Sequence, residues 1–363
     1  MPKKRILFIT PLPPPVHGSA MMSQYIKDSR IINEAFDCDF INLSTSRRMD
    51  EIGKMSWRKI IRFFSSYFIL TGKLPAHRYD LCYLAITCHG IGFLKDLPFV
   101  LICKMFRRKV VLHQHNKGMA ADVNRWPYHW LFPLAYRNTK VILLSMALYE
   151  DISKVVAKNQ ILVCPNGIPT ETYRVEAKPH NIPCMLFLSN LLVDKGVLTL
   201  LDACEILKNE GKEFICRFVG GETKEIDSKV FAEETKKRRI DDCVTYVGKK
   251  YGKEKAEAFC NADIFVQPTF DDCFPLTVLE AMQYGLPVVA TNQGAIIEMV
   301  EHGKTGLICQ TKDAVDLARK LKLLLDNPPL RLQYGKAGSE RFKSNYTLER
   351  FEECMVSCLS ASK

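Results

Sequence analysis

Two series of alternating strand-like and helix-like segments most strongly limit what this 363-residue chain can fold into. In each series a short apolar run is followed by a loop and then by a helix-like segment; the first series starts at 5–10 and the second at 183. Strands that alternate with helices form parallel sheets covered by helices. The segment 168–182, with Pro169 and Pro179, separates the series, so we expect two α/β units rather than one large sheet.

The apolar runs predict strands, and the segments between them predict helices. Expected strands are 5–10, 80–86, 109–113, 141–144, 185–188, 215–219, 244–247, 264–267 and 287–290, with helices at 198–209, 253–262 and 276–284 and a helical hairpin over 330–357. Open parallel sheets bind ligands at the carboxyl ends of their strands. We therefore expect the chemistry in the strand-to-helix loops, facing a cleft between the two units.

The composition is that of a soluble globular protein, with 47% hydrophobic and 25% charged residues. The apolar run 6–9 is too short for a signal peptide, and the run 97–103 is too short for a membrane span. The fourteen cysteines form no CxxC pair, and Cys354 and Cys358 have no histidine cluster nearby, so we expect neither a metal site nor disulfides. This pattern predicts a cytoplasmic protein.

The net charge of +11 lies entirely in the first half of the chain. Residues 1–182 hold 26 Lys and Arg against 13 Asp and Glu, whereas the remainder holds 25 against 27. A basic half suits nucleic acid, an anionic membrane surface or a phosphorylated substrate, and it also suits an ordinary solvated face. No motif supports nucleic-acid binding.

The segment 268–290 carries the sharpest functional pattern. A strand ends at Gln267 and a polar loop follows; Pro275 is expected in the first helical turn, and Gly285 ends the helix. The N-terminus of such a helix is a site for a diphosphate. Asp272 precedes the helix and Glu280 lies beyond its first turn, so the two carboxylates can accept hydrogen bonds from different parts of one ligand. Taken alone, Glu280 is more often an ordinary surface residue.

The spacing from Asp272 to Glu280 resembles the E-x7-E signature of family 4 retaining glycosyltransferases of GT-B fold, also called glycosyl transferases group 1, with Asp in the first position. The resemblance implies two Rossmann-like domains facing across a cleft, with C-terminal helices that pack back toward the N-terminal domain. It implies an acceptor domain over 1–172, a nucleotide-sugar donor domain over 173–340 and a returning helix over 341–363. It also implies that Asp272 contacts the transferred sugar and Glu280 the nucleotide ribose.

Further matches cover nearly the whole second half. The segment 189–196 resembles G-R-L-x-x-x-K-G, whose Arg and Lys neutralise the leaving diphosphate; Lys195 is retained, but Asn190 replaces the Arg and supplies no charge. Segments 218–221 and 244–248 resemble glycine loops that follow strands, the latter lining the nucleobase pocket, and 291–298, 302–307 and 165–168 match as well. By resemblance the donor contacts include Gly221, Val247, Phe274, Pro275 and Leu276. Pro275 stands where glycine is common.

The first half gives fewer matches. The loop 15–19 resembles a glycine loop whose amides approach the donor phosphate, which assigns Gly18. Near the end of the strand 109–113, where the family places a histidine close to the donor sugar, His115 aligns better than His113. Asp37 and Asp39 form a DxD in an edge strand, for which we expect no metal role. His89–Gly92 begins like GxGxxG, but Lys95 stands at the third glycine position, so a dinucleotide fingerprint is unsupported.

The segment 57–68 predicts an amphipathic helix with Trp57, Ile60, Ile61, Phe64 and Phe68 on one stripe. The bases Arg58, Lys59 and Arg62 lie off the stripe. Two interpretations remain open here. The stripe packs against the first domain, or, with the basic charge of this half and of 107–109, it lies on a membrane surface.

Together these features predict a metal-independent retaining glycosyltransferase that needs no cofactor. We expect a nucleotide-sugar donor, with UDP as the favoured base, and a saccharide or lipid-linked saccharide acceptor in surface polysaccharide synthesis. His115, Asp272 and Lys195 are the expected catalytic residues. Two alternatives remain: a nucleotide-sugar epimerase or hydrolase of GT-B fold, and a non-catalytic subunit that binds nucleotide-sugar or a membrane glycolipid. We expect a cytoplasmic location, with peripheral association to the inner face of the membrane as an open question.

Overall fold

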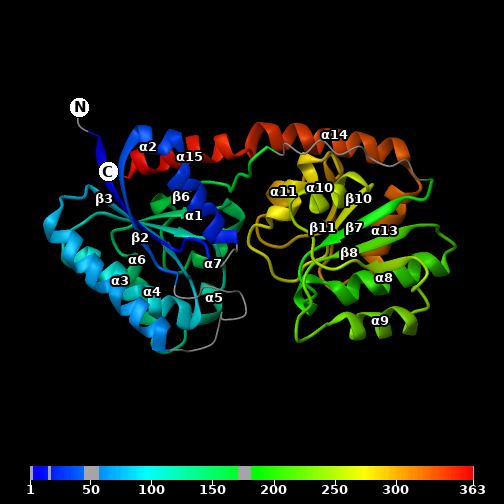
Figure 1. Cartoon of the computed structure of the whole chain (residues 1–363), viewed down its shortest axis with the longest axis horizontal. Helices are drawn as coiled ribbons and strands as arrows, with labels where there is room; N and C mark the ends of the chain where they lie inside the picture. Colours follow the sequence, from blue (N-terminus) through cyan, green and yellow to red (C-terminus); the bar gives the residue numbers. More distant parts are fainter. Residues whose placement is uncertain (1–2, 15–17, 45–56, 171–180, 363) are drawn as a thin grey trace. The chain divides into compact units, whose positions relative to one another are not determined.

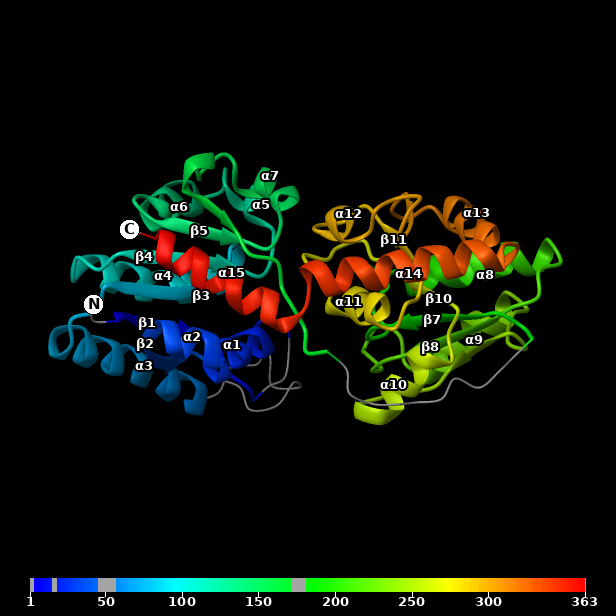
Figure 2. The same ribbon diagram turned by 90° about the horizontal axis from the view of Figure 1, so that it is seen from above.

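The computed structural model describes residues 3–14, 18–44, 57–170 and 181–362. The chain divides into two compact units, which are described separately: unit 1 comprises Met1–Asn166 with Leu348–Lys363, and unit 2 comprises Gly167–Thr347. Within the described residues each unit holds one six-stranded sheet whose paired strands all run parallel. Helices cover both faces of each sheet (Figure 1; Figure 2). The predicted α/β class is confirmed.

The sheet of unit 1 has the strand order β2-β1-β3-β4-β5-β6. Its strands are β1 Lys4–Thr10, β2 Phe36–Asn42, β3 Leu81–Ile86, β4 Val110–Gln114, β5 Lys140–Leu143 and β6 Ile161–Val163. All six residues of β3 and the last five of β1 are buried, because both faces of a parallel sheet are covered by helices. The DxD aspartates lie in β2, the predicted edge strand.

The helices of unit 1 follow the strands in the βα order that the sequence predicted. They are α1 Gly18–Asp28, α2 Arg30–Ala35, α3 Trp57–Ala76, α4 Gly90–Met105, α5 Met119–Asp122, α6 Tyr128–Tyr136, α7 Tyr149–Ile152 and α15 Leu348–Ala361, with the 3-10 helices η2 Met146–Leu148 and η3 Lys158–Gln160. Leu70 and Leu74 of α3 join the apolar core with Phe93 and Phe99 of α4.

The sheet of unit 2 has the order β12-β11-β10-β7-β8-β9. Its strands are β7 Cys184–Leu188, β8 Ile215–Val219, β9 Val244–Tyr246, β10 Ile264–Gln267, β11 Val288–Thr291 and β12 Gly306–Cys309. The order places the ends of β10, β7, β8 and β9 side by side. Loops that are far apart in the sequence therefore meet at one edge of the sheet, the edge at which open parallel sheets bind their ligands.

The helices of unit 2 complete the second α/β layer structure. They are α8 Val197–Asn209, α9 Ser228–Lys237, α10 Gly252–Cys260, α11 Leu276–Gln283, α12 Ile296–Met299, α13 Ala314–Leu325 and α14 Pro328–Asn345, with the 3-10 helix η4 Val193–Lys195. Several start at side-chain caps: Asp227 accepts hydrogen bonds from two amides of α9, and Asp313 accepts one from Asp316. Leu200, Phe218 and Leu321 are among the buried residues of this core.

Two predictions about helices in the second half of the chain are wrong: the position of Pro275 in α11 and the helical hairpin of the tail. Pro275 is not in the first turn of α11 but is its N-cap residue, because its backbone is extended (ψ 112°) and Leu276 is the first helical residue. The end of the helix is as predicted: Gly285 has φ +70°, and its amide donates to the carbonyl of Met282. The tail is not a helical hairpin, because α14 belongs to unit 2 and α15 to unit 1.

The helix α15 closes the core of unit 1, as the resemblance implied for the end of the chain. It packs on α2, and the ammonium of Lys4 in β1 donates to the Leu359 carbonyl at 3.1 Å. The thiols of Cys354 and Cys358 on α15 both lie against the carbonyl of Val163 in β6, at 3.3 and 3.7 Å. All fourteen cysteines are described as free thiols.

Candidate functional site

The loop after β10 carries Asp272 and leads into α11. Its path is fixed by a close approach of backbone to backbone: a Cβ on Gly294 would lie 2.2 Å from the Asp272 carbonyl oxygen, and Gly294 has φ +52°. The amide of Ala295 donates to the Cys273 carbonyl at 2.8 Å. Phe274 is buried beneath this loop. The glycine of the matched segment 291–295 thus holds the Asp272 loop in place, which the sequence pattern had not indicated.

Lys195 lies at the end of η4, in the loop after β7. Its ammonium forms an ion pair with Asp272, with 2.6 Å between Nζ and Oδ2, and also donates to the carbonyl of Asp271 at 3.2 Å. Gly196 allows this contact, because a Cβ there would lie 2.0 Å from the Pro268 carbonyl oxygen. Two of the three predicted catalytic residues, Lys195 and Asp272, are therefore directly paired although they lie 77 positions apart.

Glu280 lies in the second turn of α11 and faces α10. Its Oε1 accepts a hydrogen bond from Lys255 at 2.7 Å, and both side chains are largely shielded from solvent. The sequence did not indicate Lys255, because nothing in the local pattern says which residue of a neighbouring helix faces Glu280. Glu280 is therefore not a fully exposed surface residue, and its role in binding a ligand stays a prediction. Its carboxylate is held in place by a cation and keeps acceptor capacity for a hydroxyl donor.

Asn190 and Gly221 lie at the ends of the adjacent strands β7 and β8. The Asn190 side-chain oxygen accepts a hydrogen bond from the Gly221 amide at 3.2 Å. Gly220 is equally close to the first loop, since a Cβ there would lie 1.7 Å from the Ser189 carbonyl oxygen. Val247, assigned to the nucleobase pocket, follows β9 and its amide donates to the Phe218 carbonyl at 2.9 Å. Hydrogen bonds thus join the loops after β7, β8 and β9.

The two candidate histidines of unit 1 lie two positions apart: His113 is in β4, and His115 is the residue that follows this strand. His113 is fully buried in the strand, and its Nδ1 is 2.7 Å from the Tyr83 hydroxyl. Burial, together with the neighbouring His115, holds the pKa of His113 well below the ordinary value, so His113 is a neutral core residue. His115 is only partly buried, and the centroids of the two rings are 4.1 Å apart. Of the two, His115 is therefore the one with some exposure to solvent.

Gly18 is the first residue of α1 and is exposed, whereas residues 15–17 of its predicted loop lie outside the described residues. The site residues thus fall into two groups. Gly18 and His115 belong to unit 1. The other assigned residues belong to unit 2, where the structure brings together Lys195 with Asp272 and Asn190 with Gly221, and where Glu280, Val247, Phe274, Pro275 and Leu276 follow strand ends or lie in α11.

Asp37 and Asp39 of the DxD have partners that explain them without a ligand. Arg5 lies 3.3 Å from Asp37 and 3.1 Å from Asp39, and Tyr79 donates to Asp39 at 2.6 Å. His89 is the N-cap residue of α4. Among the residues that the structure describes, no group of three or more His, Cys, Asp or Glu side chains is arranged to hold a metal ion.

The two sheets with their helices define a two-domain fold of GT-B type. Residues 170–341 match the family described as glycosyl transferases group 1, and the predicted resemblance is confirmed. The solved structure of Anabaena Alr3699/HepE in complex with UDP superposes with a TM-score of 0.76 over 99% of this chain and 100% of that chain, at 16% identity.

Two curated relatives illustrate the range of sequences that match. The chain is 27% identical to a sulfoquinovosyl transferase of Arabidopsis thaliana, over 66% of this chain and 49% of that protein. It is 29% identical to the N,N'-diacetylbacillosaminyl-diphospho-undecaprenol alpha-1,3-N-acetylgalactosaminyltransferase of Campylobacter jejuni, over 65% of each. The chain spans about half the length of several of the curated relatives it matches. No described helix has both the length and the hydropathy needed to cross a membrane.

Proposed function

We propose that this protein is a retaining glycosyltransferase that moves a hexose-type sugar from a nucleotide-sugar, with UDP as the favoured nucleotide, to a saccharide or lipid-linked saccharide acceptor. The observation that carries the proposal is the Lys195–Asp272 pair at the carboxyl ends of β7 and β10, beside α11 with Glu280. The UDP complex of HepE supports the donor class. The name of the Campylobacter relative supports a lipid-linked acceptor, and that of the amylovoran biosynthesis relative of Erwinia amylovora supports surface polysaccharide synthesis.

In the proposed reaction the bond between the anomeric carbon and the diphosphate oxygen breaks as an oxocarbenium-like centre develops. Lys195 stabilises the negative charge that grows on the leaving diphosphate, the role that preorganised cations have in many transferases. Asp272 and Glu280 accept hydrogen bonds from sugar and ribose hydroxyls. The acceptor hydroxyl attacks from the leaving-group side, its proton passes to the departing phosphate, and the configuration is retained. His115 orients or polarises the sugar, and no metal ion or other cofactor is required.

The proposal predicts that Lys195→Ala lowers turnover about a hundredfold or more, since losing one charge-stabilising contact costs about 3–4 kcal/mol of barrier. Glu280→Ala should lower kcat/KM about tenfold or more, since it removes the carboxylate that accepts hydrogen bonds from the ribose hydroxyls. The assay is release of nucleoside diphosphate from UDP-, GDP- and ADP-sugars, with and without acceptor saccharides, after a thermal-shift screen for binding. Lys304→Ala is the matched control, because Lys304 lies in unit 2 in an exposed ion pair with Glu301. We expect EDTA to leave the rate unchanged.

Each contrary result has a separate meaning. Near-normal rates in Lys195→Ala or Glu280→Ala contradict the assigned site, and loss of activity in EDTA contradicts metal independence. Conversion of the donor without any acceptor product indicates an epimerase or hydrolase. Binding of a nucleotide-sugar without release of nucleoside diphosphate under any condition indicates a non-catalytic binding subunit.

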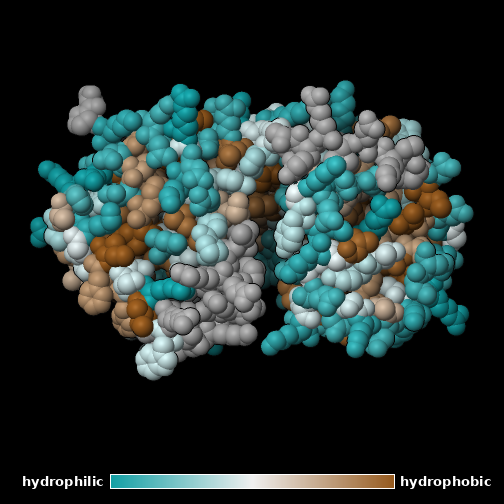
Figure 3. Space-filling model, in the orientation of Figure 1, coloured by the Kyte–Doolittle hydropathy of each residue, from teal (hydrophilic) through white to brown (hydrophobic). Residues whose placement is uncertain are grey.

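We also propose that unit 1 lies on an anionic membrane surface through α3. The described side chains of the stripe, Trp57, Ile61, Phe64 and Phe68, are exposed rather than packed, with Trp57 80% and Phe68 75% accessible. The side chain of Ile60, the fifth predicted member, lies outside the described residues. The opposite face of α3 is the one that packs: Tyr67 stacks on Phe99 with 4.2 Å between ring centroids. Hydrophobic residues gather over this part of unit 1 (Figure 3). The structure therefore favours the second of the two interpretations of this helix.

The charge around the stripe suits anionic headgroups. The nearest described basic side chain in sequence is that of Arg62. The basic residues 107–109 follow α4, and Arg108 donates to the carbonyls of Leu74 and His77 at the C-terminal end of α3. The sequence of α3 holds no acidic residue in its 20 positions. An amphipathic helix with an apolar face and basic flanks binds in the interface of anionic bilayers. This surface holds part of the basic charge of the first half and suits a lipid-linked acceptor.

We expect Phe64→Glu and Phe68→Glu each to lower the partition coefficient of the protein onto phosphatidylglycerol-containing vesicles, measured by sedimentation, about tenfold or more, because burying one Phe side chain contributes about 1.5–3 kcal/mol. Leu332→Glu is the matched control: Leu332 is 76% exposed on α14 of unit 2. Vesicles of phosphatidylcholine alone should bind weakly. Failure of the unmodified protein to sediment with the anionic vesicles at physiological salt contradicts this part of the proposal and leaves the donor site untouched.

A further inference from the structure

The loop surface at the ends of β7, β8 and β9 has a basic side chain that the sequence patterns did not single out. Lys249 follows Gly248 in the loop after β9 and crosses over Gly221: a Cβ on Gly221 would lie 2.3 Å from Lys249 Cε and 3.1 Å from its Nζ. The same Cβ would lie 2.8 Å from Asn190 Oδ1. The Lys249 ammonium and the Asn190 amide thus share one small region above the Gly221 backbone.

This region is built rather than incidental, because backbone hydrogen bonds join the three loops. The Gly220 amide donates to the Gly248 carbonyl at 3.0 Å, and the Leu191 amide donates to the Gly221 carbonyl at 2.8 Å. The Tyr246 hydroxyl donates to the Gly220 carbonyl at 2.9 Å. Since Gly221 has no side chain, the stem of Lys249 can lie directly over the loop and carry its charge toward Asn190.

The charges of the surrounding lysines are already engaged. Lys195 pairs with Asp272, Lys255 with Glu280 and Lys250 with Glu254. Among the residues that the structure describes, Lys249 forms no ion pair, and its side chain is exposed. Asn190 itself is neutral. An anion held over the loops after β7 and β8 would therefore receive its uncompensated positive charge from Lys249.

We propose that Lys249 is the second cation of the diphosphate site and supplies the positive charge that Asn190 lacks. This inference rests on the proposed function, since it assumes that the loops after β7 and β8 hold a nucleoside diphosphate. In this arrangement Lys195 lies near the end of the loop 189–196, and Lys249 lies beside Asn190 near its start. The diphosphate binds between the two ammonium groups. An exposed, unpaired ammonium retains its full charge for such a ligand, whereas that of Lys195 is shared with Asp272.

The test is the affinity of UDP and uridine for the full chain, measured by calorimetry. We expect Lys249→Ala to raise the Kd for UDP about tenfold, which corresponds to about 1.4 kcal/mol, and to leave uridine binding unchanged. Lys250→Ala is the matched control, because it removes the neighbouring lysine and its exposed pair with Glu254. Adding Asn190→Arg to Lys249→Ala should restore most of the UDP affinity, since it returns a cation to the same region.

Two further outcomes separate this inference from the proposed function. If the unmodified chain binds GDP or ADP in place of UDP, the same variants are tested with that nucleotide and its nucleoside. If it binds none of the three, the proposed function fails and the inference fails with it. If the unmodified chain binds UDP and Lys249→Ala binds it within about twofold of the same Kd, the donor site stands and the role of Lys249 is refuted.

Discussion

At the scale of single residues, some charged side chains stabilise the fold, and others belong to the candidate ligand site. In the edge strand β2, Asp39 accepts hydrogen bonds from Tyr79 at 2.6 Å and Arg5 at 3.1 Å, and Lys73 lies 3.3 Å away. Burial by itself raises the pKa of Asp39, but the hydrogen bonds from Tyr79 and Lys73 and the charge of Arg5 outweigh it, so the pKa is lowered. The sequence shows a DxD pattern, whereas in the fold Asp39 is a structural anchor that joins β2 to Arg5 in β1 and to Lys73 in α3.

This anchor predicts a pH dependence of unit 1. Because the pKa of Asp39 is lower in the folded than in the unfolded state, its stabilisation is present above the unfolded pKa, near 4, and is lost as the pH falls through the folded pKa. Asp39→Asn should therefore lower the free energy of unfolding by about 1–2 kcal/mol at pH 7, and the difference should shrink below about pH 4.

Urea unfolding followed by tryptophan fluorescence measures this effect, because all three tryptophans, Trp57, Trp126 and Trp130, belong to unit 1. Asp37→Asn serves as the control. Its carboxylate also pairs with Arg5 but is 57% exposed against 26% for Asp39, so we expect a smaller loss, within about 1 kcal/mol. A difference between Asp39→Asn and the unmodified protein that does not change with pH would refute the interpretation.

The candidate site shows which residue roles a sequence can indicate. Lys195, Asp272 and Glu280 were predicted from motif spacing, and the structure pairs the first two directly and shields the third. Lys255 and Lys249 were not predicted, because each acts on a residue in a different loop or helix and has no fixed spacing from it. The partner of a charged residue depends on which strand ends are neighbours, and the order of strands in a sheet cannot be inferred from any short stretch of sequence.

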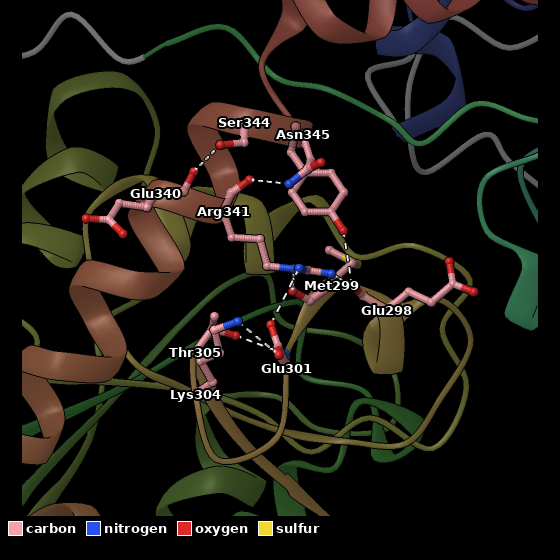
Figure 4. A network of polar contacts seen from close by, with 10 residues as sticks. Glu298, Met299, Glu301, Lys304, Thr305, Glu340, Arg341, Ser344 and Asn345 are labelled. Atoms are coloured by element: carbon pink, nitrogen blue, oxygen red, sulfur yellow. Dashed lines mark hydrogen bonds and ion pairs between the residues drawn. The ribbon is translucent and has the colours of Figure 1, made fainter.

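At the scale of elements, α14 is held to the rest of unit 2 by close backbone packing and by polar contacts. Arg341 donates through Nη2 to the Glu298 carbonyl at 2.6 Å and through Nε to the Met299 carbonyl at 3.1 Å, at the end of α12 (Figure 4). Glu301 lies 3.7 Å from Arg341 Nη1. Carbonyl groups at a helix end have no partner inside the helix, so a guanidinium there stabilises both elements.

Gly335 sets how closely α14 approaches α11. A Cβ at Gly335 would lie 1.9 Å from the Gly285 carbonyl oxygen, a backbone atom that cannot swing aside. Helix propensity alone predicts that Gly335→Ala stabilises the protein by about 1 kcal/mol. We expect the opposite, a loss of about 1–3 kcal/mol from overpacking.

Gly338→Ala is the matched control for this prediction. Gly338 is buried in the same helix, but the nearest atom to a Cβ there is 3.8 Å away, an ordinary van der Waals contact. This variant should be neutral or stabilised. Differential scanning calorimetry measures the melting temperature of each variant. Equal melting temperatures for the two would show that the approach of α14 to α11 is not fixed by Gly335.

At the scale of the whole molecule, the chain passes from unit 1 to unit 2 after Asn166 and returns after Thr347. Unit 1 is therefore assembled from both ends of the sequence. Its last helix, α15, packs on α2 and contacts the end of β6, so the C-terminal residues complete a core whose other parts lie before residue 167. The sequence alone predicted helices for this tail, and the resemblance predicted their return, but the break between α14 and α15 at residues 346–347 appears only in the structure.

The alternation of apolar runs and helix-like segments was enough to predict two parallel sheets, because strand and helix periodicity are local properties of the chain, but the strand ranges predicted from it left out β2, β6 and β12. Motif spacing was enough to predict the resemblance to glycosyl transferases group 1 and to name the candidates Lys195, Asp272 and Glu280. Tertiary structure alone decided that His113 is fully buried and His115 only partly, that the described residues of the α3 stripe are exposed, and that Lys249 lies over Gly221 beside Asn190. Each of these depends on which elements pack together, and packing is a property of contacts between distant segments rather than of any one of them.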